Sequence, residues 1–182
     1  MSIRRTGLLL LAIVALTPGA ASATGHNADL SGDGTLALGS RLWGFHEMFA
    51  KTLPVPKPYR DLSVVADLSI YRGSENNTAQ TLIGWMGGAR YTLGGATLRP
   101  VKNVNARVTL SPYGLLGAFH PNGHKGAASA AIGGALDVVA GKNSSSEPGW
   151  GFRASVDRVF RNGAPDVTRI SLGTVYRFGH QK

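Results

Sequence analysis

The sequence predicts an all-β fold, an antiparallel up-and-down transmembrane β-barrel of about eight strands. Three observations support this prediction. Six runs of roughly 10 to 14 residues alternate apolar and polar side chains, as strands with one apolar face do. The i, i+3, i+4 spacing of amphipathic helices is rare after residue 23. The charged residues within the six runs are Asp and Arg, and nearly all of them share a face with Gly, Ala and Ser.

The N-terminus has the pattern of a secretory signal peptide. Arg4 and Arg5 precede an apolar run, and the small residues Ala21-Ser22-Ala23 form a cleavage site of the A-x-A kind. The apolar run is shorter than the ~20 residues that a membrane-spanning helix needs. We therefore expect export, with residues 1–23 as signal peptide, 24–34 as a flexible N-terminal segment and 35–182 as the barrel domain.

The segment after the signal peptide is the least regular part of the chain. Asp29 to Gly34 resembles the start of a calcium loop, but the twelfth position of that loop is Ser40, where Glu is required. We therefore expect an exposed segment and no metal site. Two weaker strands are predicted at Thr35–Ser40 and Trp43–Ala50, and three prolines between residues 54 and 58 end the second of them.

Six strands are predicted with clear alternation. Short stretches rich in Gly, Asn, Pro or Ser separate them and indicate turns, including a turn from Gly94 to Asn105. The predicted strands are Leu62–Arg72, Thr81–Leu93, Ala106–Phe119, Ala128–Ala140, Trp150–Arg161 and Val167–Phe178.

Charged residues distinguish a membrane barrel from a soluble sandwich, which also alternates. Within the six runs the charges are Asp and Arg, whereas Lys and Glu are expected in loops. Asp and Arg can satisfy one another bidentately in a narrow lumen, and eight strands enclose just enough space for side chains to fill. Arg153 and Asp157 lie four apart on one strand face. The predicted lumen charge network is Asp67, Arg90, Arg107, Asp137, Arg153, Asp157, Arg169 and Arg177.

Aromatic residues concentrate toward the predicted strand ends, where a membrane barrel carries its interfacial girdles. The girdle residues predicted in this way are Tyr71, Tyr91, Phe119, Trp150, Phe160, Tyr176 and Phe178.

The last strand carries the most specific motif. Ser171, Gly173, Tyr176 and Phe178 follow the pattern polar–x–Gly–x–x–aromatic–x–aromatic. With the alternating runs between Leu62 and Gly179, this motif makes the chain resemble the small OmpA/OmpX-like outer-membrane β-barrel proteins. The resemblance implies an outer-membrane location, contact with membrane lipid and lipopolysaccharide, insertion by the barrel-assembly machinery through the C-terminal motif, and a monomer.

Composition excludes other classes. The formal charge is +9, but most arginines lie singly within strands, so we expect no nucleic-acid binding. Cysteine is absent, so pairing and packing alone must hold the exported fold.

Catalysis would require a nucleophile, a base and a carboxylate on one wall. All five histidines (His26, His46, His120, His124 and His180) fall in the irregular N-terminal part, in turns or in the tail. We therefore expect no enzyme and no cofactor. The favoured function is a structural or interaction role with a lumen filled by side chains. The alternatives are a narrow pore for small solutes, a lipid A-modifying barrel enzyme and a soluble periplasmic lipocalin-like binder.

Overall fold

A computed structural model describes residues 28–38, 41–54, 61–75, 78–101, 104–121, 126–141 and 148–178. The predicted signal peptide, residues 1–23, lies outside the described residues. The strands are β1 (Ala28–Leu38), β2 (Arg41–Thr52), β3 (Leu62–Glu75), β4 (Thr78–Tyr91), β5 (Leu93–Val101), β6 (Val104–Pro121), β7 (Ala127–Gly141), β8 (Gly149–Arg161) and β9 (Val167–Phe178).

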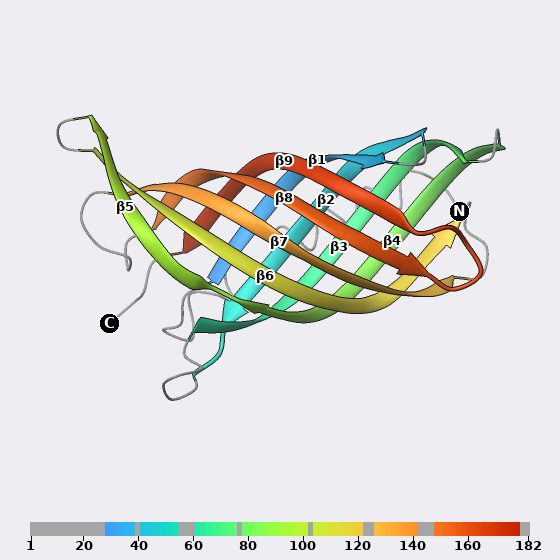
Figure 1. Cartoon of the computed structure of the whole chain (residues 1–182), viewed down its shortest axis with the longest axis horizontal. Helices are drawn as coiled ribbons and strands as arrows, with labels where there is room; N and C mark the ends of the chain where they lie inside the picture. The colour runs from blue at the N-terminus through green and yellow to red at the C-terminus, as the bar shows by residue number, and fades with distance from the viewer. Residues whose placement is uncertain are drawn as a thin grey trace.

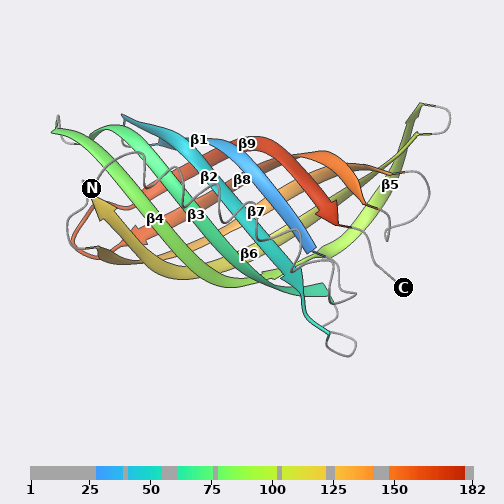
Figure 2. The same cartoon turned by 180° about the vertical axis from the view of Figure 1, so that it is seen from behind.

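The strands form one closed antiparallel barrel, seen from two sides in Figures 1 and 2. Strand β1 pairs with β9 as well as β2, and β4 pairs with β6, so the sheet has no open edge around the wall. Thr92 alone separates β4 from β5, and both pair with β6, so they occupy one position in the wall. The predicted fold class, an eight-stranded antiparallel barrel, is confirmed.

The pairing registers define the stagger of the barrel. Followed from strand to strand, the partners return to β1 ten residues from the starting point, as a closed and tilted barrel requires. The successive partners are Ala28, Lys51, Val64, Ala89, Gly114, Ile132, Arg158, Thr168 and Leu38.

Two ends of the barrel must be distinguished. Strands β1, β3, β6 and β8 finish at one end of the barrel, which we call the hairpin end. Strand β1 begins and β9 finishes at the other, which we call the terminal end. At the terminal end, β5 and the start of β6 form an arm that extends past the wall (Figure 1).

The predicted turn from Gly94 to Asn105 is wrong, because most of that segment forms the strands of the arm. Register shifts between Leu93 and Gly95 let β5 stay paired with β6. A Cβ atom at Gly95 would lie 2.8 Å from the Val108 carbonyl oxygen, so glycine permits this close approach.

The N-terminal segment is also corrected. Residues 28–34, predicted to be flexible, belong to β1, and the two weaker strands are longer than expected. Strand β1 pairs along its whole length with β9 and nearly as far with β2, so sheet closure orders a stretch that its glycines made look like a loop.

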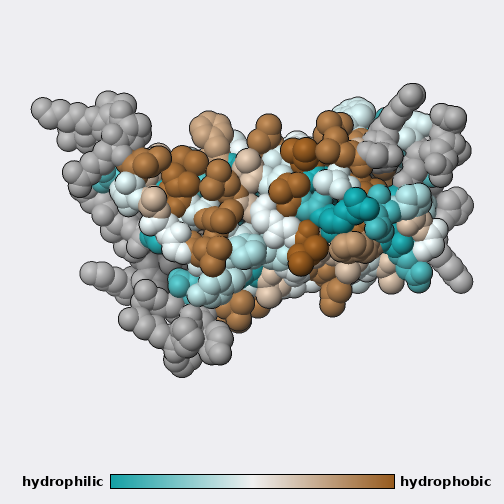
Figure 3. All heavy atoms as spheres, in the orientation of Figure 1, coloured by the Kyte–Doolittle hydropathy of each residue, from teal (hydrophilic) through white to brown (hydrophobic). Residues whose placement is uncertain are grey.

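The outer wall carries many exposed large apolar side chains. On the face shown in Figure 3 they form groups with neutral and hydrophilic residues between them. Large apolar side chains face outward with high exposure, for example Leu116 at 70% and Leu172 at 67%. Among the described residues, charged side chains on three strands break this pattern, namely Glu47, Lys51, Arg72 and Arg158. Glu47 and Lys51 alternate with the buried side chains of β2 and so also face outward, which corrects the expectation that Lys and Glu lie in loops.

The prediction of aromatic girdles is correct in part. Trp150 and Tyr91 face outward at the terminal end and Phe160 near the hairpin end. Tyr71 and Phe119, predicted to be girdle residues, instead face the lumen, are buried and lie 6.1 Å apart between ring centroids. Their position in the alternation decides this orientation, because Tyr71 follows the buried Ser69 by two positions and Phe119 follows the buried Leu115 by four.

Candidate functional site: the lumen

The first ionic cluster of the lumen is organised by Arg153 of β8, which is 1% exposed. Its guanidinium donates to Asp137 through Nε (2.7 Å) and Nη2 (2.8 Å), a bidentate pair across adjacent strands. It also donates to Ser31 Oγ at 2.8 Å and to Asp29 Oδ1 at 3.2 Å. Arg90 of β4 donates to both oxygens of Asp29. Asp29 thus links arginines from two strands.

The second cluster is organised by Arg169 of β9. Its Nε and Nη2 atoms donate to the two oxygens of Asp157 at 2.7 and 2.6 Å. The Tyr113 hydroxyl donates to Asp157 Oδ2 at 2.8 Å, and Arg169 Nη1 donates to the Tyr71 hydroxyl at 2.9 Å. Asp67 Oδ2 lies 3.7 Å from Arg169 Nη2. This cluster connects β3, β6, β8 and β9 through the interior.

His46 joins the second cluster. Its Nδ1 atom lies 3.0 Å from Thr35 Oγ1, and its Nε2 atom lies 3.4 Å from Asp33 and 3.7 Å from Asp67. Because Nε2 faces carboxylates, the proton of a neutral ring belongs on Nε2, and Nδ1 accepts from the Thr35 hydroxyl. The Ser171 hydroxyl lies 2.8 Å from the same Thr35 oxygen. The expectation that every histidine lies in an irregular segment, a turn or the tail is therefore wrong for His46, which lies in β2, and for His120, which lies in β6.

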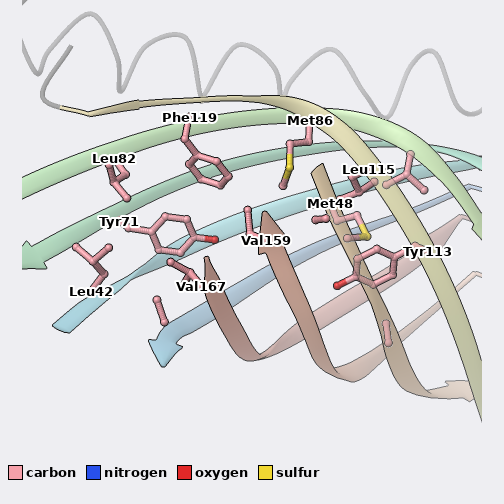
Figure 4. Close-up of a cluster of buried hydrophobic side chains, with 14 of the residues drawn as sticks. Leu42, Met48, Tyr71, Leu82, Met86, Tyr113, Leu115, Phe119, Val159 and Val167 are labelled. Carbon is pink, nitrogen blue, oxygen red and sulfur yellow. The ribbon is translucent and has the colours of Figure 1, made fainter. Parts of the chain in front are cut away.

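Apolar side chains close the lumen toward the hairpin end. Figure 4 shows Tyr71, Leu82 and Phe119 converging from different strands. Together with Leu42, Val159 and Val167 they leave a hollow of only about 20 Å³, too small for a solute.

Arginines lie at the opposite end of the lumen. Arg107 and Arg177 are half-buried, and no carboxylate in the described part of the chain forms an ion pair with either. Of the eight predicted network residues, six are thus joined in ionic clusters, whereas Arg107 and Arg177 stand apart at the terminal end.

Sequence reasoning missed Asp29, Asp33 and His46, which all lie in the lumen and are at most 5% exposed. A signal was present, because Asp29, Ser31, Asp33 and Thr35 alternate with Leu30, Gly32, Gly34 and Leu36. The glycines and the similarity to a calcium loop concealed this period of two.

The C-terminal motif divides between the two faces of β9. Ser171 and Gly173 face the lumen, and a side chain at Gly173 would overlap the backbone of Asp33. Tyr176 packs edge-on against Phe178, with ring centroids 4.9 Å apart, and Trp150 lies 4.8 Å from Tyr176. The two motif aromatics therefore belong to an aromatic group at the terminal end.

No protein-family model matches the chain, and no curated protein matches it. Among solved structures, it is similar to Neisserial surface protein A, NspA, with a TM-score of 0.54 and 13% identity over 86% of this chain and 97% of NspA. The chain has the fold of a small outer-membrane β-barrel. This fold confirms the OmpA/OmpX-like resemblance at the level of architecture, while the low identity carries no further property.

Two other outer-membrane barrels show lower similarity. The Yersinia pestis protein Ail gives a TM-score of 0.48 and 16% identity over 84% of this chain and 99% of Ail. The N-terminal barrel of Pseudomonas aeruginosa OprF gives 0.43 and 14% identity over 84% and 97%. Within the described ranges, no helix has the length and apolarity needed to cross a membrane.

The Tyr113–Asp157 hydrogen bond provides a first prediction. Replacing Tyr113 by Phe removes the hydroxyl that donates a hydrogen bond to Asp157. We expect the free energy of unfolding to fall by about 1.5–3 kcal/mol, the usual contribution of a hydrogen bond to a charged group. Urea titration of the folded barrel in detergent measures this change. Tyr91→Phe, on the outer wall, is the control, and equal effects of the two variants would contradict the assignment.

Proposed function

We propose that this chain is an integral outer-membrane β-barrel with a structural or interaction role and a lumen filled by side chains. The supporting observation is that hydrogen bonds cross the lumen between strands that are not neighbours. Arg90 of β4 reaches Asp29 of β1, Tyr113 of β6 reaches Asp157 of β8, and Arg169 of β9 reaches Tyr71 of β3. These bonds occupy the path that a solute would take.

Features of the surface support the proposed location and partners. An apolar outer wall with aromatic residues near both ends matches the lipid-facing band of a membrane barrel. Outer-membrane lipid and lipopolysaccharide are the proposed surroundings, and the C-terminal motif supports insertion by the barrel-assembly machinery. We propose a monomer, because the closed wall leaves no strand edge to pair around its circumference.

The alternatives receive less support. A lipid A-modifying enzyme would need an accessible nucleophile, but the Ser171 and Thr35 hydroxyls near His46 are buried at 2% and 5% exposure. A lipocalin-like binder would need an apolar cavity in the lumen, where this chain places ion pairs. A narrow pore remains the alternative that conductance must test.

Planar-bilayer recording tests the filled lumen. Refolded protein should migrate differently on a gel before and after boiling, which establishes the folded barrel, and should then produce no conductance steps above the lipid background. Discrete steps from the same preparation would support the narrow pore. Absence of the gel shift, with solubility in buffer without detergent, would contradict the membrane barrel itself.

A further inference from the structure

At the terminal end of the barrel, the end of β2 lies beside the start of β3 (Figure 2). The outer wall carries a hollow there. Its volume is about 680 Å³, within the usual range of about 300–1,000 Å³ for ligand sites. Its floor is Val64 and Ala66 of β3, and Phe49 bounds it on β2. The remaining lining residues are Lys51, Thr52, Leu53 and Pro54.

The rim of this hollow is built into the fold. The Leu53 amide donates to the Leu62 carbonyl at 2.9 Å, which holds Leu53 and Pro54 against the start of β3. Ala66 is the smallest side chain of the lining and pairs with Phe49 across the strands, so the ring stands beside a low floor. The result is an apolar recess bordered by one bulky ring.

Lys51 is the charged residue of the lining, and its position indicates the ligand. It pairs with Ala28, the first residue of β1, so it lies at the terminal end, the same end of the barrel as the outward-facing Tyr91 and Trp150. Girdle aromatics mark the depth of lipid headgroups. No carboxylate of the described residues forms an ion pair with Lys51. A lysine near the headgroups can bury its methylene stem and present its ammonium to a lipid phosphate.

We propose that this hollow binds one glycerophospholipid of the surrounding leaflet, with an acyl chain against Val64 and Ala66 and the phosphate on Lys51. The ligand is recognised by two features together, an apolar recess and a cation at headgroup depth. This inference rests on the proposed membrane location but not on the state of the lumen, since Lys51, Val64 and Ala66 face the outside of the barrel.

Native mass spectrometry of the refolded barrel with phosphatidylglycerol tests the site. The wild type should retain one lipid, and Lys51→Ala should bind about fivefold more weakly, the effect of one lysine at the headgroup level. Ala66→Trp should also lose the lipid while keeping Lys51, because the indole fills the recess. Lys51→Arg should retain it.

Arg72→Ala is the matched control, because Arg72 is an exposed cation near the hairpin end of β3 and should leave retention unchanged. All variants must first show the gel shift of the folded barrel. Equal retention by the wild type, Lys51→Ala and Ala66→Trp would overturn the site, as would equal losses in Lys51→Ala and Arg72→Ala. A diacylglycerol with the same chains, retained as well as phosphatidylglycerol, would overturn the phosphate contact. A folded barrel that fails these tests leaves the proposed function standing, whereas loss of the gel shift in the wild type contradicts that function.

Discussion

Replacing Arg153 by Ala should lower the free energy of unfolding by about 3–5 kcal/mol, the usual cost of leaving a buried charge without its partner. Arg153 is the bidentate partner of Asp137 and also bonds Ser31 and Asp29. Its loss removes the ion pair of a carboxylate that is 1% exposed. Equilibrium unfolding in urea, followed by the gel shift or by tryptophan fluorescence, gives the change.

The control is Arg158→Ala, on the same strand but on the outer face. Arg158 forms an ion pair with Asp166 at 3.4 Å, with side-chain exposures of 52% and 37%. Exposed pairs contribute about 0–1 kcal/mol, so this variant should be nearly neutral. The double variant Arg153→Met with Asp137→Leu should recover much of the lost stability, because it removes both charges together. Arg153→Ala and Arg158→Ala with the same midpoint would contradict the buried cluster.

Replacing Gly88 by Ala should have a comparable effect through the backbone. Gly88 faces the lumen on β4, and a methyl group there would overlap the Gly114 carbonyl oxygen of β6. This contact involves backbone at the seam that closes the barrel, so neither strand can move aside without loss of pairing. We expect a destabilisation on the order of 3 kcal/mol, at the upper end of the cost of overpacking, and a smaller folded fraction after refolding.

Gly114→Ala is the matched control at the same seam. A Cβ atom at Gly114 would meet nothing within 4 Å, because this residue faces outward. Since alanine restricts the unfolded chain more than glycine, the substitution should be neutral or stabilising by about 0.5–1 kcal/mol. Similar losses for both variants, measured by the fraction of shifted band on gels, would show that closure of the β4–β6 seam does not depend on the absence of a side chain at Gly88.

The fold was predictable because strand periodicity is a local property. A period of two assigns each side chain to one face whatever its neighbours are, so the six clear strands and the faces of Asp67, Arg90 and Asp157 follow from alternation alone. Local pattern failed at β1, where glycines interrupt the apolar face, and at β5, where Gly94 and Gly95 resembled a turn. Both segments are ordered by pairing with strands distant in sequence.

The alternation of side chains does not determine which Asp pairs with which Arg in the lumen. Arg153 and Asp157 share a strand face four residues apart, yet Arg153 pairs with Asp137 and Asp157 with Arg169. Cross-strand register brings Asp137 opposite Arg153 and Asp157 opposite Arg169. By itself the sequence determined an all-β chain with an apolar outer face and an Asp/Arg inner face, because both faces follow from residue types and spacing. Tertiary structure alone decided which charges meet, that Asp29, Asp33 and His46 join them, and where the outer wall is hollow, because register, stagger and closure link residues that are far apart in the chain.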